Sequence, residues 1–393
     1  MRILYISYWG IDDALTKATV IPSIKLLRDY SKELFLCTME RSARYSDVIL
    51  PRGVLHIPAI NFHNLPRLFR KLFDFIILYS TLVKICKRHS VSTVVCRGAM
   101  AGAFGYLLYR RFKLPFHVES FEPHADYMVE GGTWKKTGIE YRIQSFFEVK
   151  QIRYATTLMP VSFNYYNELM KKRGVPPKRL MMMPCCVDVE KFRFNYEARC
   201  RIRQNLGISM DTIVGIYVGK FGDIYYEDES FVIFKESFNI FGNFYLIILS
   251  PDPRGKILEK LKKHKVFEGK VLVSHVQYDE VPDFLSASDF GFSLIKSTPS
   301  RRFCSPIKDG EYWANGLLTL LTAGVGDDEQ IIRINSAGAI INTKIESIRE
   351  GLFYLKSQMA KETREELSDR ISPLAVQYRN FEIIEKGYRQ IFE

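Results

Sequence analysis

Short apolar runs alternate with longer amphipathic stretches along this chain, and this alternation restricts the possible fold more than any other feature. The runs are four to seven residues long and do not alternate in polarity, which is typical of strands covered on both faces. Such strand–helix alternation predicts a parallel sheet with right-handed crossovers, the doubly wound α/β class. In the first half we expect strands over 3–7, 34–37, 54–57, 92–96, 116–119, 157–161 and 180–183, and helices over 18–30, 65–88, 100–112, 138–153 and 165–173.

The pattern begins again after residue 188, and 393 residues are too many for one comfortable core. We therefore expect two Rossmann-like domains, 1–188 and 189–372, that face each other across a cleft. A last helix over about 373–393 is expected to pack back on the first domain. The second half has expected strands over 213–218, 244–249, 270–273, 290–295, 318–322 and 339–342, and expected helices over 228–239, 256–264, 281–287, 306–315 and 345–360.

The composition places the chain among ordinary globular proteins. Hydrophobic residues make up 47% of it and charged residues 25%, which excludes a disordered or fibrous chain. The first expected strand begins at Ile3, so we expect no signal peptide, and the longest mainly apolar run, 73–83, is too short to span a bilayer. The seven cysteines show no CxxC pair and no zinc spacing. These features predict a cytoplasmic protein with reduced thiols.

The basic residues are unevenly distributed. The formal net charge is +12, and the whole excess falls within residues 1–190. Residues 51–118 contain eleven lysines and arginines and one acidic residue, which predicts an anionic partner: membrane headgroups, a phosphorylated substrate or nucleic acid. Arg67, Arg70 and Lys71 are interleaved with large apolar residues, as in a helix that docks on anionic lipid, although a core-facing apolar stripe with a solvated basic face would look the same. The regional charge favours docking, and so a protein peripheral on the inner face of a membrane.

The segment 305–316 has the signals of a capped helix whose N-terminus can hold an anion. Ser305 is a preferred N-cap residue, Pro306 a preferred first helical residue, and a glycine closes the segment. Lys308 would lie in the first turn, where a cation is unfavourable for the helix itself but would suit a bound phosphate. Glu311 shares a face with it and could accept hydrogen bonds from ribose hydroxyls. The alternative is a capped helix with a solvent-exposed Lys–Glu pair.

Two further strand ends carry candidate groups. Gly219 and Lys220 follow the expected strand 213–218, where a glycine would let the backbone approach a phosphate. Glu119, Glu122 and His124 crowd the loop expected after strand 116–119, and could bind or deprotonate an acceptor hydroxyl. In both places the alternative is a polar loop without a ligand.

An ordered set of motifs resembles the retaining family 4 glycosyltransferases of the GT-B fold. The pattern Ser-Pro-x-Lys-x-x-Glu-Tyr-x-Ala-x-Gly over 305–316, followed by a buried strand and a glycine-containing turn, is similar to the donor-nucleotide region of that family. Other segments match in the same order along nearly the whole chain: Val161-Ser162, 183–192, 217–220 and 284–289.

The resemblance implies a role for each matching residue. Glu311 would hold the donor ribose, and Gly219, Lys220, Ser305 and Lys308 would lie near the diphosphate. Lys220 stands where the family usually has an arginine that binds the diphosphate. A lysine is a point charge and cannot make the bidentate contact of a guanidinium group. The family's second basic residue is missing after it.

Other positions complete the set of candidates. We expect Arg301 or Arg302 to supply the missing charge, and the resemblance implies that the loop at Gly10, after the first strand, contacts phosphate or sugar. The family's earlier glutamate, eight positions before Glu311, falls on Phe303, so sugar recognition through that carboxylate is not expected.

The function implied is transfer of a hexose from a nucleotide-diphosphate sugar to a glycan or lipid-linked acceptor, with retention, in bacterial-type surface polysaccharide or glycoconjugate synthesis. No metal and no cofactor are expected, since no Asp-x-Asp motif stands out. A nucleotide-sugar 2-epimerase on the same fold is an alternative, but it would leave the basic region unexplained. Nucleic-acid binding is a third, but no recognisable module supports it and no nucleic-acid partner is expected.

Overall fold

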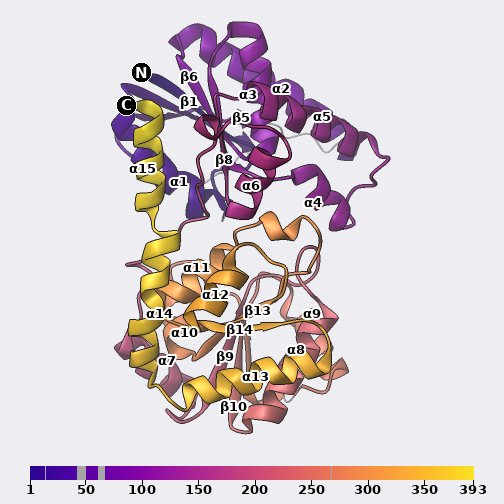
Figure 1. Cartoon of the computed structure of the whole chain (residues 1–393), viewed down its shortest axis with the longest axis vertical. Helices are drawn as coiled ribbons and strands as arrows, with labels where there is room; N and C mark the ends of the chain where they lie inside the picture. Colours follow the sequence, from indigo (N-terminus) through magenta and orange to yellow (C-terminus); the bar gives the residue numbers. More distant parts are fainter. Residues whose placement is uncertain (14, 42–49, 61–66, 267) are drawn as a thin grey trace. The chain divides into compact units, whose positions relative to one another are not determined.

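The computed structural model describes residues 1–13, 15–41, 50–60, 67–266 and 268–393, and they form two compact units. Unit 1 consists of Met1–Cys186 together with Phe381–Glu393, and unit 2 of Val187–Asn380. Each unit is a twisted parallel sheet flanked by helices (Figure 1). The chain therefore passes between the units twice, after Cys186 and after Asn380.

Unit 1 contains a six-stranded parallel sheet in the order β4-β2-β1-β6-β7-β8. Helices α1 and α15 contact each other on one face, and α3 packs against α5 on the other (Figure 1). The strands are β1 (Arg2–Ser7), β2 (Glu33–Cys37), β3 (Met39–Glu40), β4 (Val54–His56), β5 (Ala59–Ile60), β6 (Thr93–Arg97), β7 (Phe116–Phe121) and β8 (Thr157–Pro160), with β3 and β5 paired separately. The helices are α1 (Ile21–Leu27), α2 (Arg67–His89), α3 (Gly98–Phe112), α4 (His124–Glu130), α5 (Ile139–Tyr154), α6 (Phe163–Lys171) and α15 (Phe381–Phe392).

Unit 2 repeats the design, with strand order β11-β10-β9-β12-β13-β14. Its strands are mainly apolar because helices cover both faces of the sheet. The strands are β9 (Ile213–Val218), β10 (Phe244–Leu249), β11 (Val271–Ser274), β12 (Phe290–Ser293), β13 (Leu318–Thr322) and β14 (Gly338–Ile341). The helices are α7 (Tyr196–Asn205), α8 (Asp228–Phe241), α9 (Arg254–Lys263), α10 (Val281–Ala287), α11 (Ile307–Ala314), α12 (Asp328–Asn335), α13 (Ile345–Met359) and α14 (Arg364–Arg379).

The strand order reverses beside the first strand of each unit. In unit 1 the reversal lies between β1 and β6, and in unit 2 between β9 and β12. In open α/β sheets the connections leave this point in opposite directions, so a crevice opens at the carboxyl ends of the two strands. The residues that follow β9 and β12 are therefore the first place to look for a site in unit 2.

The C-terminal helix expected over 373–393 is in fact two helices. Helix α14 starts earlier, behind a capping box formed by Thr363 and Glu366, and contains Pro373 within it. It ends at Arg379, and the extended backbone of the next residue, Asn380, forms a parallel bridge with Val187. Helix α15 then begins in unit 1, so only this last part packs there. Other differences are that 180–183 forms a single bridge in place of a strand, and that α4, α7 and α12 were not expected.

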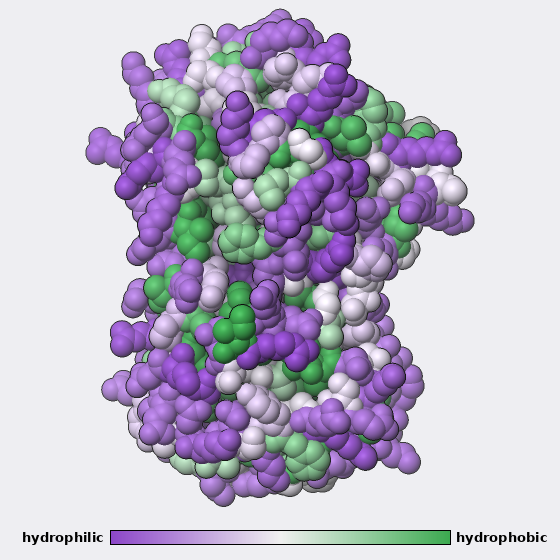
Figure 2. All heavy atoms as spheres, viewed as in Figure 1, coloured by the Kyte–Doolittle hydropathy of each residue, from purple (hydrophilic) through white to green (hydrophobic). Residues whose placement is uncertain are grey.

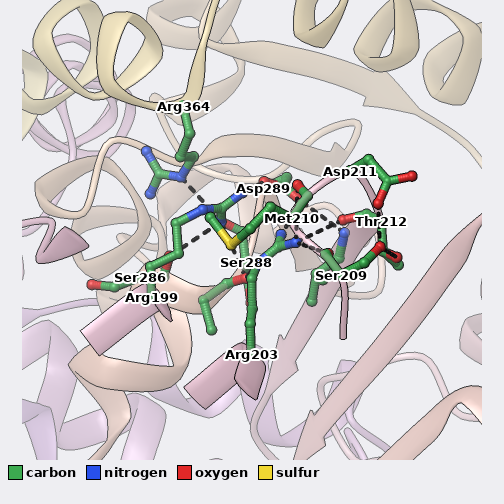
Figure 3. A network of polar contacts seen from close by, with 12 residues as sticks. Arg199, Arg203, Ser209, Met210, Asp211, Thr212, Ser286, Ser288, Asp289 and Arg364 are labelled. Carbon is green, nitrogen blue, oxygen red and sulfur yellow. Dashed lines mark hydrogen bonds and ion pairs between the residues drawn. The ribbon is translucent and has the colours of Figure 1, made fainter. Parts of the chain in front are cut away.

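A buried ionic network ties helix α7 to the sheet of unit 2 (Figure 3). The Asp289 carboxylate accepts hydrogen bonds from the guanidinium groups of Arg199 at 2.7 Å and Arg203 at 2.8 Å, and from the backbone N–H of Val214 at 2.7 Å. Arg203 also donates to backbone carbonyls, and Arg364 of α14 donates to the carbonyl of Ser288 at 3.0 Å. Because Asp289 precedes β12 and Val214 lies in β9, the network fixes the two strands that flank the reversal.

Removing this carboxylate should strongly destabilise unit 2. We expect Asp289→Ala to lower the free energy of unfolding by about 3–5 kcal/mol, because two buried guanidinium groups lose their counter-charge. Denaturant unfolding followed by fluorescence measures the change. Arg201→Ala is the control: this α7 arginine pairs with Asp283 at 2.6 Å on the surface, and its loss should change stability by less than about 1 kcal/mol. Equal effects in both variants would contradict the assignment.

Candidate functional site

Helix α11 is anchored across the two strands at the reversal point. The Tyr312 hydroxyl accepts from the backbone N–H of Val218, at the end of β9, at 3.3 Å and donates to the carbonyl of Phe292 in β12 at 3.2 Å. Gly291 makes room for this ring, since a Cβ there would lie 2.5 Å from the tyrosine. The first turn of α11 is thereby held beside the carboxyl end of β9.

Lys308 lies in that first turn and is buried. Its Nζ sits over the rings of Tyr225 at 4.2 Å and Tyr217 at 5.0 Å, and it has no hydrogen-bond partner among the described residues. Burial lowers the pKa of Lys308 from 10.5 to about 8. Aromatic faces offset only part of the cost of a buried charge. An amine held in this way favours the arrival of an anion.

Gly219 brings the backbone up to this amine. It follows β9 with a φ of +136°, and a Cβ at this position would lie 3.0 Å from the Nζ of Lys308. Only glycine adopts this backbone without strain and leaves the space open. The structure thus places Gly219 and Lys308, two of the candidates for diphosphate contact, side by side.

The other two candidates for the diphosphate are engaged elsewhere. The Lys220 amine pairs with Asp223 at 2.6 Å on the surface of the loop. Helix α11 begins at Ile307, with Pro306 at the N-cap position and no side-chain cap. The expected capping by Ser305 is therefore wrong: its Oγ accepts a hydrogen bond from Arg379 at the end of α14.

Glu311 lies one turn beyond Lys308 and is also buried. Its Oε1 accepts a hydrogen bond from the hydroxyl of Tyr278 at 3.0 Å. Burial raises the pKa of Glu311 to about 7, while Tyr278 and Lys308 act in the opposite direction. Tyr278 was not predicted; it follows β11, and Lys191 lies over its ring at 4.2 Å. The expectation of a solvent-exposed Lys–Glu pair is thus excluded.

Arg301 and Arg302 form a short turn before α11. Arg301 is buried, and its charge opposes the rise that burial causes in the pKa of Tyr225, which places it on the Lys308 side. The Arg302 guanidinium lies over the ring of Phe303 at 4.5 Å. Of the two, Arg301 is therefore the better candidate for a second positive charge.

A second buried polar group, missed in the sequence, lies behind the first turn of α11. Asp309 and Asp328 are fully buried, and burial raises the pKa of both carboxyls. Arg379 pairs with Asp328. Three charged residues, Lys308, Asp309 and Glu311, thus lie buried on one short helix, where charged side chains are rarely found.

Glu119 in unit 1 is a strand residue, as expected for strand 116–119, but β7 continues to Phe121, so the expected loop begins later. It lies within β7 and is buried; its carboxylate accepts from the hydroxyls of Tyr5 at 2.7 Å and of Tyr388 in α15, and Arg97 lies 3.6 Å away. The charge and the hydrogen-bonding capacity of Glu119 are therefore largely used within the fold. This arrangement also fixes α15 to the sheet of unit 1.

His124 begins helix α4, which again corrects the expected loop. Its ring meets the ring of Trp134 edge-on, with centroids 5.7 Å apart. Glu148 of α5 accepts from the N–H of Ala125 in the first turn of α4 at 2.9 Å. Burial raises the pKa of Glu148 to about 7, and the charges of Glu122 and Asp126 add to the rise. Glu122, His124 and the unpredicted Glu148 are thus brought together.

Gly10 lies after β1 against a carboxylate. A Cβ there would lie 2.7 Å from Oε2 of Glu40, and the backbone N–H of Ile11 donates to Oε1 of the same group at 2.8 Å. The loop at Gly10 is therefore fixed from within unit 1. The side chains of Arg67 and Arg70 lie outside the described residues, and Lys71 stands over the ring of Trp134 at 5.5 Å.

Within the described part of the chain, no three histidine, cysteine or acidic side chains cluster as metal ligands. The absence of a metal and of a cofactor stays a prediction. In the same residues no helix is both long and apolar enough to cross a bilayer.

Comparison with known proteins identifies the fold. No protein-family model and no curated protein matches the chain. Among solved structures it resembles sucrose-phosphate synthase from Thermosynechococcus elongatus (TM-score 0.79, 14% identity, 100% of this chain and 99% of that chain). It also resembles WaaG, a glycosyltransferase involved in lipopolysaccharide biosynthesis (0.72, 16%, 98% of each chain), and HepE from Anabaena in complex with UDP (0.71, 11%, 100% and 99%). The predicted class, two Rossmann-like units of the GT-B fold, is confirmed, whereas membership of family 4 stays a prediction.

The desolvated amine of Lys308 leads to a stability prediction. The unfolded chain binds a proton on Lys308 up to pH 10.5, whereas the folded chain releases it near pH 8, so stability should rise between about pH 8 and pH 10.5. We expect Lys308→Met to increase the free energy of unfolding at pH 7 by about 1–3 kcal/mol and to flatten this rise. Denaturant unfolding across this pH range measures both. A less stable variant would show that the amine has a partner.

Proposed function

We propose that this protein transfers a sugar from a nucleoside-diphosphate donor to an acceptor, as a glycosyltransferase. The observation that carries the proposal is the buried Lys308 amine, which lies beside Gly219 and one turn from Glu311 at the reversal point of unit 2. Solved structures with this fold include HepE with UDP and with UDP-glucose. Both findings support a nucleotide-sugar donor bound by unit 2.

Breaking the sugar–phosphate bond leaves a diphosphate with additional negative charge. The Lys308 amine and the N-terminal amide groups of α11 would stabilise that charge as it develops. Because the amine is already desolvated, it needs no reorganisation when the charge appears. Arg301 would add a second positive charge, and Lys220 could join after leaving Asp223.

Glu311 would hold the donor ribose. Tyr278 occupies Oε1, which fixes the carboxylate and leaves Oε2 to accept from a ribose hydroxyl. Burial strengthens a charge-assisted hydrogen bond of this kind. Donor binding by these two residues requires Lys308 to be protonated and Glu311 to be ionised at the same pH.

The acceptor would bind to unit 1 at the end of β7. His124 and Glu122 are the candidates to contact the acceptor hydroxyl, with Glu148 supporting the start of α4. Glu119 would act through Arg97 at the end of β6. We further propose a hexosyl donor, retention, a glycan or lipid-linked acceptor of surface polysaccharide or glycoconjugate synthesis, and a cytoplasmic location at the inner face of the membrane.

Glu311→Ala and Lys308→Ala should each weaken nucleoside-diphosphate binding by roughly tenfold to a hundredfold, because each removes a charge-assisted contact. A thermal-shift screen of UDP, GDP, ADP and CMP selects the nucleotide, and calorimetry measures its affinity. Glu259→Ala and Lys262→Ala, exposed positions on α9, are matched controls and should bind normally. Unchanged affinity in both site variants would remove the donor assignment.

Nucleotide affinity should be greatest between about pH 7 and pH 8. Below this window Glu311 becomes protonated, and above it Lys308 loses its proton. A bound diphosphate raises the pKa of the amine, so binding at about pH 8–9 should take up protons. Calorimetry in two buffers of different ionisation enthalpy measures this uptake, which Lys308→Met should abolish. Affinity that is flat from pH 6 to pH 9 would be inconsistent with these two groups as ligands.

A further inference from the structure

Helix α5 exposes a stripe of large apolar side chains to solvent and buries polar ones on its opposite side. Ile139 is 61% exposed, and Ile143, Phe146 and Val149 are each 52% exposed. Their spacing places them on one face. On the opposite side Gln144 and Gln151 are buried, together with the half-buried Glu148. Among the described residues, this pattern leaves an apolar face of α5 largely exposed to solvent, which is unusual for a surface helix.

The same face carries only positive charge. Arg142 and Arg153 are exposed between the apolar residues, and Lys150 stands over the ring of Phe146 at 5.0 Å. The acidic residues of the helix, Glu140 and Glu148, fall on other sides. An apolar stripe flanked by cations is complementary to an anionic bilayer, in which the apolar acyl chains lie below a layer of negatively charged headgroups.

An arginine-lined hollow lies at the C-terminal end of this face. Its volume is about 380 Å³, and Arg153, Arg173 and Arg179 line it together with Val149. Arg179 is held in place by donating to the backbone carbonyls of Ile152 at 2.8 Å and Ala155 at 2.7 Å. Among the residues that the structure describes, no acidic side chain lines the hollow. Val149 and Arg153 belong to both features, so the hollow continues the exposed face.

Helix α2 lies next to α5, since the rings of Phe75 and Phe147 are 6.4 Å apart. It exposes Leu72, Phe73 and Ile76 as well. Figure 2 shows apolar residues at the surface, among hydrophilic ones, in the region where Figure 1 places these two helices.

We propose that the exposed face of α5 docks on an anionic lipid bilayer and that the arginine hollow receives a lipid phosphate. The apolar side chains would enter the boundary between headgroups and acyl chains, and the basic residues would stay at headgroup level. A second copy of the chain is a poor occupant, because a two-fold contact would set the cations of this face against one another. The inference rests on the proposed function in one respect: an enzyme docked on a bilayer would take its acceptor from that membrane.

Vesicle flotation of the full chain tests this inference. The protein should float with vesicles of phosphatidylcholine and phosphatidylglycerol, weakly with phosphatidylcholine alone, and less as salt screens the charges. The double variant Ile143→Ser with Phe146→Ser should bind at least about tenfold more weakly. Arg153→Ala with Arg173→Ala should weaken binding about 25-fold, at roughly fivefold for each arginine.

Matched controls come from unit 2. Ile334→Ser with Phe353→Ser removes apolar residues that are 72% and 56% exposed, and Arg193→Ala with Lys262→Ala removes exposed cations; both should float normally. All variants change exposed side chains, and thermal melting verifies that they fold. No flotation of the native chain, equal flotation of all variants, or a dimer that the α5 variants disperse would each overturn the proposal. Nucleotide affinity, measured in parallel, should be unchanged in the α5 variants, so failure here is distinguishable from failure of the donor site.

Discussion

The desolvated amine of Lys308 is the constraint on which the arrangement of unit 2 depends. A charge in this position costs stability, and the surrounding rings of Tyr217 and Tyr225 repay only part of that cost. Gly219 approaches so closely that no side chain from the end of β9 can serve as a counter-ion. The amine is thus buried without a hydrogen-bond partner among the described residues, with Asp309 and Glu311 as its nearby negative charges, and a diphosphate would contact it directly.

Hydrogen bonds hold the elements around this amine in place. Tyr312 bonds α11 to both β9 and β12, and the carboxylate of Asp289 ties the beginnings of the same strands to α7. The carboxylate of Asp289 in Figure 3 is paired with both guanidinium groups, whereas the amine of Lys308 has no hydrogen-bond partner in the described part of the chain. The beginnings of β9 and β12 are therefore stabilised by paired charges, whereas the charge at the carboxyl end of β9 lacks a hydrogen-bond partner among the described residues. This is expected where binding requires preorganised charge.

In unit 1 the two sides of helix α5 have different proposed roles. The inner side of α5 carries Glu148, which supports the beginning of α4 beside His124. Its outer side carries the apolar and basic residues of the proposed lipid face. If that face meets a bilayer, the helix lies between the membrane and the region proposed for the acceptor, which suits an acceptor drawn from the lipid.

The sequence by itself determined the two α/β repeats, because strands covered on both faces must be largely apolar. Strands β9, β10 and β13 have the expected bounds. Helical spacing likewise placed Lys308 and Glu311 on one face. The pair Thr363 and Glu366 matches the capping-box pattern, and this local signal could have predicted the start of α14. Only the tertiary structure showed that Tyr278 holds Glu311, that Glu119 is enclosed by tyrosines, and that α5 is apolar outside. Local pattern encodes which residues share a face, whereas the partners and the solvent exposure of that face depend on segments far apart in the chain.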